Sequence, residues 1–485
     1  LRRIVRRCGR WRALPVLLFV TTQLLMLPMR GQEQQTVPWT QEEKLYAYSK
    51  FWAEAKRNFV YMYKVGGDRW DSLYRALMPE VLASRTDAGF VKLMERFSAF
   101  LQDGHTYVSS DFRRGEDVTT NYFRSGISLW TGLVEDRLVV LRIDSLHAGL
   151  VPPGSELVAV DGVPAMDYLM ANIWPYVAAS APHVRLKQAA QLFLMAAKGT
   201  RREVTFRVGK ELKAMELVND YVDPYSPPVG LPGLERQGGG GGFGLSWPEE
   251  DIACVRIATL SDDRVIEQFD AAFPELQKRA RGVIIDLRDN GGGSTDRGTH
   301  ILSHFTSKTH LTGSRWSTRC YKPAYASWGA ASPSHPALTP ADTAGNRFNR
   351  ECYLQANDLA TVDGGGMEAD FDPGHPCLEV PVAVLTNSNT ASACEDFLIF
   401  ADSVANVFQV GEPTSGSTGT PIFIALIPGL SCRICTKKDT YPDGREFVGR
   451  GIIPDVYVPV TLESLRKNED IQLRAAVAEI KKRLR

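Results

Sequence analysis

The sequence has 485 residues, of which 44% are hydrophobic, 23% charged and 9% aromatic. This composition is typical of a folded globular protein and excludes a largely disordered, collagen-like or small disulfide-stabilised chain. Its 56 Lys and Arg residues balance 56 Asp and Glu residues, so no net positive charge favours nucleic-acid binding. The length predicts about three domains.

The first 30 residues carry seven arginines and no acidic residue, around an apolar run from Ala13 to Pro28. A basic start followed by an apolar run of this length is typical of a secretory signal, and the run is short for a membrane span, which needs about 20 residues. We predict a signal peptide over residues 1–31 and an exported, periplasmic or extracellular protein. Membrane attachment is expected only if that segment stays uncleaved. Removing its seven arginines leaves 49 basic against 56 acidic residues, an acidic mature chain.

Helical patterns come first along the mature chain. Apolar residues recur at three- and four-residue spacing from Phe90 to Leu101, and Thr86 precedes them as a candidate cap. An aromatic-rich helix is expected earlier, over residues 43–59. Together these patterns predict an N-terminal helical subdomain over residues 38–121.

The period then changes to that of strands. Residues 122–227 alternate β-rich runs with turn signals around one expected helix, and they predict a small β-rich domain. A Gly-rich linker is expected next, over 228–246. The strands expected in the β-rich domain include 138–141, 156–162 and 204–208.

Alternating strands and helices follow over residues 247–465, which predict an α/β domain. Its long insert, residues 313–378, shows little periodicity, and such inserts are usually functional lids or straps. A C-terminal helix is expected over 466–485. The expected strands of the α/β domain are 252–260, 282–287 and 382–386, and its expected helices are 265–280, 295–306 and 393–404.

Two segments of the α/β domain each join a strand to a helix and could bind an oxyanion. Residues 286–293 read Asp-Leu-Arg-Asp-Asn-Gly-Gly-Gly, and backbone N–H groups of such a turn can face a phosphate or an oxyanion; a plain tight turn is the alternative. In the other segment, Ser392 lies among small residues at a helix start. It is either a helix cap or an accessible nucleophile, with the next N–H available to an oxyanion.

A serine nucleophile needs a base, and histidine is the side chain best suited to that role near neutral pH. His105 stands where the helical region ends and a strand begins. A lone histidine is more often structural, and the chain offers seven others. His300 and His304 form a pair that could bind a metal, but Ile301 stands where a zinc peptidase would carry its glutamate.

The cysteine pattern gives no strong metal site. Cys432 and Cys435 lack a second pair at zinc-ribbon spacing, so a local disulfide or two thiols is favoured over a metal. Cys320, Cys352 and Cys377 share one irregular stretch in which any two could pair. We therefore expect neither a metal nor an organic cofactor.

Five segments in order resemble the C-terminal processing (tail-specific) serine peptidases, and within them the tricorn-type branch. The resemblance covers nearly the whole mature chain, including a PDZ-like domain over residues 122–227. It implies a crotonase/Clp-protease-like ββα core in the α/β domain. The segments are Asp103-Gly104-His105-Thr106, residues 286–293, Thr390-Ala391-Ser392-Ala393, the turn 411–416 and the closing Gly451-Ile452-Ile453-Pro454-Asp455.

The resemblance implies roles for individual residues. Ser392 would be the nucleophile, and Ala393 with Gly291 and Gly292 would form the oxyanion hole. The Ser/Lys branch places a lysine after the turn 411–416, where this chain has Ser417, so His105 is the expected base.

The third catalytic member is less defined by the resemblance. Tricorn-like enzymes use a Glu before the closing motif and a Ser beside the His, but here Val448 and Gly104 stand near those places. Glu446, Asp103 or a backbone carbonyl could orient the imidazole instead.

The function implied is that of an exported serine endopeptidase acting on unfolded or C-terminal peptide segments through an acyl-enzyme. A peptide or unfolded protein is the expected partner, presented by the PDZ-like domain. Two alternatives use the same fold. One is a non-catalytic ligand- or peptide-binding protein, and the other is a crotonase-like acyl-CoA enzyme.

Overall fold

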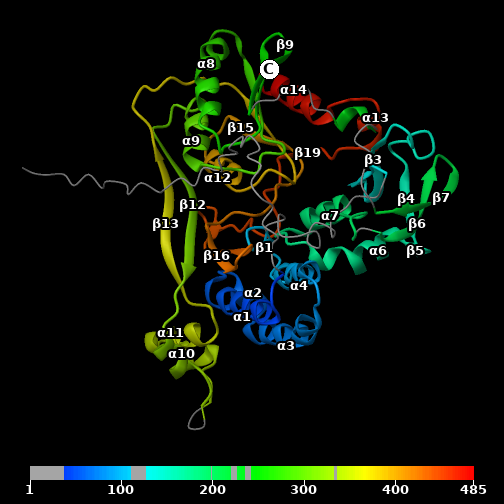
Figure 1. Ribbon diagram of the computed structural model, residues 1–485. Helices are drawn as coiled ribbons and strands as arrows, with labels where there is room; N and C mark the ends of the chain where they lie inside the picture. Colours follow the sequence, from blue (N-terminus) through cyan, green and yellow to red (C-terminus); the bar gives the residue numbers. More distant parts are fainter. Residues whose placement is uncertain (1–37, 111–126, 198, 220–226, 235–241, 333–335) are drawn as a thin grey trace, which may run out of the picture. The chain divides into compact units, whose positions relative to one another are not determined.

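The computed structural model describes residues 38–110, 127–197, 199–219, 227–234, 242–332 and 336–485 (Figure 1). All of these belong to one compact unit, Val37–Arg485. The expected signal peptide, residues 1–31, lies outside the described residues, as does the expected domain boundary at 121–122. A search of the described helices for one both long and apolar enough to cross a bilayer finds none.

The N-terminal subdomain is helical, as expected. Thr40 and Glu43 form a capping box at the start of the first helix, and the Thr86 side chain accepts the Gly89 N–H, as expected for a cap. The expected apolar stripe is buried, and the Phe97 ring stacks on Trp70 with ring centroids 4.2 Å apart. The helices are α1 (Gln41–Asn58), α2 (Met62–Val65), α3 (Gly67–Ala83) and α4 (Asp87–Ala99).

This helical core is completed by a distant hairpin, β16 (Pro421–Ile427) and β17 (Leu430–Cys435). Leu426 and Ile434 of the hairpin are buried in the same cluster as the α-helical aromatic residues. β1 (Tyr107–Ser110) pairs antiparallel with β17. Because β1 begins two residues after His105, this pairing ties that histidine to the C-terminal half of the chain.

The β-rich domain forms a sheet in which the central strands run in the order β2-β3-β4-β6-β7, all antiparallel. The expected helix over 165–177 ends earlier, as α6 (Ala165–Asn172). A 3₁₀ turn containing Pro175, which lacks the N–H that an α-helix needs, follows it. α7 (Pro182–Gln191) also packs on the sheet. The strands are β2 (Trp130–Val134), β3 (Arg137–Asp144), β4 (Glu156–Val160), β5 (Val163–Pro164), β6 (Arg201–Val208), β7 (Glu211–Val218) and β8 (Pro228–Gly230).

The α/β domain is built on a six-stranded sheet in the order β19-β15-β14-β11-β10-β9, parallel except for β9. The expected strand runs are confirmed as β10, β11 and β14. They read as continuous apolar segments because both faces of the sheet are covered. The strands are β9 (Phe243–Glu249), β10 (Ile252–Ile257), β11 (Gly282–Asp286), β14 (Val382–Thr386), β15 (Val407–Gly411) and β19 (Val456–Tyr457).

Successive residues of β11 show the two covered faces. Val283 and Ile285 pack in the cluster that contains the helices α8, α9 and α12, whereas Ile284 packs against Ile480 of the C-terminal helix α14. The expected helices are confirmed with shifted ends. They are α8 (Arg264–Arg279), α9 (Thr295–Ser303), α12 (Ala393–Ala401) and α14 (Ile471–Arg483), with α13 (Leu462–Arg466) before the last.

Two expectations about irregular segments differ from the structure. The segment expected to be a linker, 228–246, is a strand at both described ends: β8 pairs with β3 and β9 with β10. The insert 313–378 forms a two-stranded ribbon with helices at its end (Figure 1). Strand β13 contains three glycines and mostly exposed side chains, so it lacks the apolar alternation that predicts a strand. The elements are β12 (His310–Arg319), α10 (Pro323–Gly329), α11 (Arg347–Ala356) and β13 (Thr361–Asp370), with β18 (Lys438–Thr440) beside β12.

Candidate active site

Ser392 occupies a strained turn between β14 and α12. Its φ angle is +56°, a left-handed conformation that costs a non-glycine residue free energy and is found most often at functional positions. Its N–H donates to the Ser417 carbonyl at 3.1 Å, with Glu395 Oε2 3.2 Å away. The backbone is therefore held on two sides, as in the strand–turn–helix arrangement that presents serine nucleophiles.

The glycine turn lies directly against this serine. β11 and β14 are parallel neighbours, so the turns that follow them meet at the same edge of the sheet. Gly292 has a φ angle of +99°, and a Cβ there would lie 2.7 Å from the Ala391 carbonyl oxygen and 2.8 Å from Ser392 Cβ. Glycine is thus required by both the turn and the close approach.

The N–H groups near Ser392 are not equivalent. The Gly292 N–H donates to Asn290 Oδ1 at 2.9 Å and is already used. Among the described residues, the N–H groups of Gly291 and Ala393 have no hydrogen-bond acceptor in the protein. Of the two glycines expected in an oxyanion hole, Gly291 is therefore the one whose N–H can donate to a bound oxyanion.

His105 is linked to Ser392 through Ser417. Its Nδ1 lies 2.7 Å from Ser417 Oγ, and the Ser417 carbonyl accepts the Ser392 N–H. Burial, together with the positive charges of Arg433 and Lys437, lowers the pKa of His105 to about 4. The imidazole is therefore neutral at pH 7, the state that a general base requires. No hydrogen bond joins His105 to Ser392 within the described part of the chain.

Asp103 holds the backbone of His105 and makes no hydrogen bond to its ring in the described structure. Asp103 Oδ1 accepts the His105 N–H at 3.0 Å, and burial raises the pKa of the Asp103 carboxyl to about 6. Ser180, from the β-rich domain, accepts the Gly104 N–H at 2.9 Å. Asp103 is thus a structural support for the histidine loop.

Gly104 leaves room for the Ser417 hydroxyl. A Cβ at Gly104 would lie 2.8 Å from Ser417 Oγ, closer than real Cβ contacts come. Sequence reasoning noted Ser417 as the replacement of a lysine and assigned it no role. In the structure Ser417 Oγ is the hydroxyl beside the His105 ring.

Glu395 organises the loop that carries Ser417, and sequence reasoning gave it no role. Its fully buried carboxylate accepts the Thr414 hydroxyl at 2.6 Å, the Gly416 N–H at 2.7 Å and the Ser417 N–H at 3.0 Å. Burial raises the pKa of Glu395 to about 8, while these donors act to lower it. The signal that could have found it is the spacing of Glu395 three residues after Ser392, which is that of a capping box.

Glu446, the expected third member, is not brought to His105. Its Oε1 lies 2.5 Å from Lys438 Nζ, and the lysine lowers the pKa of the Glu446 carboxyl. The pair is partly exposed. Among the described residues, the structure gives no contact between Glu446 and the His105 ring.

The closing segment packs on the turn before Ser417. The Ile452 N–H donates to Thr414 Oγ1 at 2.7 Å, and the Thr414 N–H donates to the Ile452 carbonyl at 3.1 Å. A Cβ at Gly416 would lie 2.4 Å from the Gly451 nitrogen. All five segments singled out in the sequence are thus connected through Ser392 and the loop 414–417.

Residues 251–458 match the model of peptidase family S41. Curated relatives include a carboxy-terminal-processing protease of Bartonella bacilliformis, 22% identical over 230 residues. The match covers 46% of this chain and 43% of that relative, so the chain spans less than half the length of the relative.

Solved structures show the same fold at low sequence identity. Mature CPAF has a TM-score of 0.65 and 15% identity, over 91% of this chain and 98% of that one. Mature CPAF complexed with lactacystin gives a TM-score of 0.64 and 14% identity, over 92% and 98%. This chain therefore has the mixed α/β fold with several sheets seen in those structures.

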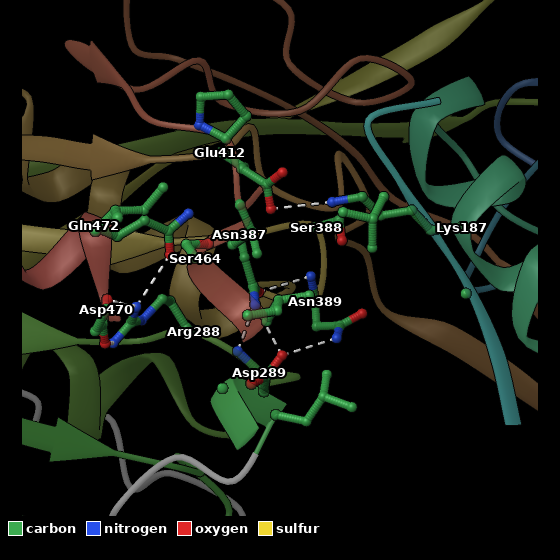
Figure 2. Close-up of a pocket in the computed structure, with 18 of the residues that line it drawn as sticks. Lys187, Arg288, Asp289, Asn387, Ser388, Asn389, Glu412, Ser464, Asp470 and Gln472 are labelled. Carbon is green, nitrogen blue, oxygen red and sulfur yellow. Dashed lines mark hydrogen bonds and ion pairs between the residues drawn. The ribbon is translucent and has the colours of Figure 1, made fainter. Parts of the chain in front are cut away.

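A cavity of about 1620 Å³ lies between the β-rich domain and the α/β domain (Figure 2). Residues 387–389, just before the turn that carries Ser392, line it, but Ser392 and His105 do not. Lys187 of the β-rich domain pairs with Glu412 at 3.0 Å across it, and Asp289 accepts the side-chain amides of Asn387 and Asn389.

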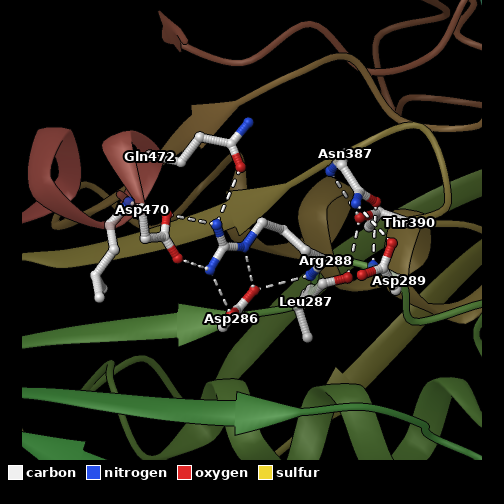
Figure 3. A network of polar contacts seen from close by, with 9 residues as sticks. Asp286, Leu287, Arg288, Asp289, Asn387, Thr390, Asp470 and Gln472 are labelled. Carbon is white, nitrogen blue, oxygen red and sulfur yellow. Dashed lines mark hydrogen bonds and ion pairs between the residues drawn. The ribbon is translucent and has the colours of Figure 1, made fainter. Parts of the chain in front are cut away.

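The floor of the cavity holds a buried ionic network (Figure 3). The Arg288 guanidinium binds Asp286 through two hydrogen bonds of 2.8 Å, and Asp470 at 2.7 and 2.8 Å. Gln472 Oε1 accepts a further hydrogen bond at 3.1 Å. These contacts raise the pKa of Arg288 and join the sheet to the start of α14.

Proposed function

We propose that this chain is a serine peptidase in which Ser392 is the nucleophile and His105 the general base. The observation that carries the proposal is the left-handed turn at Ser392, packed directly against Gly292. The N–H groups of Ala393 and Gly291, which have no acceptor among the described residues, support it. So does His105, whose ring is neutral at pH 7 and is linked to Ser392 through Ser417. The match of residues 251–458 to peptidase family S41 supports the same reaction.

The proposed reaction is acyl transfer to water. Ser392 Oγ attacks the peptide carbonyl carbon and its proton passes to His105. The N–H groups of Ala393 and Gly291 stabilise the tetrahedral oxyanion, a role in which one donor contributes about 10²–10³ in rate. His105 then protonates the leaving amine, and water hydrolyses the acyl-enzyme. The hydrogen bond between His105 and Ser392 forms when substrate is bound, as catalytic contacts often tighten in that complex.

Ser417 is a positioning residue in this proposal. It fixes the His105 ring through its hydroxyl and the Ser392 N–H through its carbonyl, so one residue sets the relation between base and nucleophile. Its own N–H is held by Glu395. Glu446 is replaced in this scheme by the Ser417 hydroxyl as the group that orients the imidazole.

The proposed substrates are unfolded or C-terminal peptide segments, presented by a PDZ-like domain over residues 122–227. The exposed edge strand of its antiparallel sheet, β7, is suited to pairing with an extended peptide. The name of the Bartonella relative, a carboxy-terminal-processing protease, supports this substrate class. We also propose an exported location, on the basic and apolar character of the first 30 residues.

A second candidate function is peptide binding without cleavage. It is favoured by one observation: the His105 ring is hydrogen-bonded to Ser417 and not to Ser392 in the described residues. The two functions differ in whether Ser392 reacts.

A fluorophosphonate probe, which reacts with activated serines, separates these functions. We expect the full chain to be labelled and to cleave casein, Ser392→Ala to lose roughly 10⁶ in kcat with its labelling, and His105→Ala to lose nearly as much. Ser388→Ala, four residues earlier in the same turn, is the matched control. This variant should keep both the labelling and the casein cleavage. If the Ser392→Ala variant were still labelled, the assignment of Ser392 as the nucleophile would be wrong. An unlabelled, inactive wild-type chain that still binds peptide would establish the second function.

A further inference from the structure

Three side chains on α8 and α9 face one another at a place remote from Ser392. His300 lies in α9 and His304, four residues later, caps the C-terminus of that helix; Asp270 faces them from α8. Their ligand atoms all lie within 4.8 Å of one another. His300 Nε2 is 2.8 Å from Asp270 Oδ1, and His304 Nε2 is 3.8 Å from the same oxygen.

The tautomer of His304 is set by a backbone carbonyl. Its Nδ1 lies 2.9 Å from the His300 carbonyl oxygen, which can only accept, so the proton is on Nδ1. Nε2 of the neutral ring therefore carries a lone pair. A backbone carbonyl on the far nitrogen is the arrangement that metal-bound histidines usually show.

An ion pair alone does not account for this geometry. The Asp270–His300 contact uses one proton, and the lone pair of His304 Nε2 lies 3.8 Å from the same carboxylate oxygen. Two acceptors at this distance repel each other, and a cation bound by both removes the repulsion. The rings of Phe269 and Phe273 pack around the His304 imidazole and hold it in this orientation.

We propose that Asp270, His300 and His304 bind a divalent transition-metal ion of the Zn²⁺ class. Two imidazole nitrogens and one carboxylate oxygen are a ligand set that Zn²⁺ takes at 2.0–2.2 Å. His300 would move its Nε2 proton to Nδ1 and coordinate through Nε2, as His304 does. Asp270 and His300 are partly exposed, so a water molecule can fill the fourth position.

The bound ion would link α8 to α9 and act as a structural clamp. α9 begins at Thr295, directly after the glycine turn, and packs against α12, which begins after Ser392. None of the three ligands contacts Ser392 or His105 in the described residues. The inference goes beyond the proposed peptidase function and does not depend on it.

Zinc titration of the full chain tests the site. We expect calorimetry with Zn²⁺ alone to show one ion per chain, and the melting temperature to rise with Zn²⁺ concentration. Co²⁺ in place of Zn²⁺ should give the visible spectrum of a four-coordinate nitrogen and oxygen site. His300→Gln, Asp270→Asn and His304→Gln should each weaken binding by at least about 10- to 100-fold.

The matched control is His310→Gln. His310 is also flanked by two carboxylates, Asp370 at Nδ1 and Glu368 at Nε2, but they lie on opposite ring nitrogens and cannot share one ion with it. The His310→Gln variant should bind Zn²⁺ as tightly as the wild type does. His300→Gln replaces a partly exposed side chain, so its fold is checked by its melting temperature without metal. The site would be overturned if the wild type did not bind one Zn²⁺ per chain. It would also be overturned if the three ligand variants bound Zn²⁺ as tightly as the wild type.

Discussion

Two buried ionisable groups at the carboxyl end of the same sheet have opposite kinds of partner. Glu395 is a carboxyl group surrounded by neutral donors, namely backbone N–H groups and the Thr414 hydroxyl. Arg288 is a guanidinium between two carboxylates, Asp286 and Asp470. A buried charge is unfavourable unless it is compensated, and the two sites achieve this in different ways.

The difference indicates what each group does. The donors of Glu395 belong to the loop 414–417 and to Ser392, so the carboxylate fixes backbone around the proposed nucleophile. The partners of Arg288 lie on β11 and at the start of α14, so the guanidinium joins elements of the fold. We expect the first site to control activity as well as stability and the second to control stability alone, and four changes test this.

The largest effect is expected from Glu395→Gln. The amide replaces one acceptor oxygen with a donor, which leaves two backbone or hydroxyl donors without a partner and shifts the loop that carries Ser417. We expect kcat to fall about 100- to 1,000-fold. The free energy of unfolding should fall by about 2–6 kcal/mol, at about 1–3 kcal/mol for each orphaned donor. Peptide cleavage and urea denaturation measure these, and unchanged kcat would refute the assigned role.

Arg288→Met should affect stability and not chemistry. It leaves the buried Asp286 beside Asp470 without a cation, a change that typically costs about 3–5 kcal/mol. The kcat per labelled active site should stay within about threefold of the wild type, because no partner of Arg288 contacts Ser392. Urea denaturation together with active-site titration provides the measurement. A loss of kcat as large as that of Glu395→Gln would remove the distinction between the two sites.

Ser417→Ala should affect chemistry and not stability, the reverse of Arg288→Met. The His105 ring loses its Nδ1 partner, and misplacement of a catalytic group by about 1 Å can reduce the rate about 100-fold. We expect kcat to fall about 10- to 100-fold with little change in KM or melting temperature. Ser417→Thr, which keeps the hydroxyl, should retain more activity. Equal kcat for both variants would show that the hydroxyl has no positioning role.

The smallest effect is expected from a change of pH: kcat/KM should fall little as the pH is lowered from 8 to 5. Burial lowers the His105 pKa from 6.5 to about 4, so the ring stays a base until the pH falls to about 4. The unfolded chain binds more protons at this histidine between pH 4 and 6.5, so its contribution to stability rises with pH across that window. Arg288→Met should keep the same acid limb. An acid limb near 6.5 would contradict the buried, neutral His105.

Local patterns predicted most of the α/β and helical elements. The apolar stripe of α4 and the apolar runs of β11 and β14 follow from the burial of residues close in sequence, which leaves a periodic signal. The ribbon β12–β13 left none, because its side chains are largely exposed and its glycines lack side chains to alternate. The segment 228–246 was mistaken for a linker because its glycines lie between two short strands.

The sequence by itself determined which segments meet: a histidine loop, a glycine turn, a serine turn and a closing Gly-Ile-x-Pro-Asp. The tertiary structure decided how they meet. It placed the Ser417 hydroxyl on the His105 ring, 312 positions apart in the chain, and it occupied the Gly292 N–H with Asn290. It also paired Glu446 with Lys438. Hydrogen bonds between residues so far apart depend on how whole elements pack, and a single sequence carries no periodic trace of them.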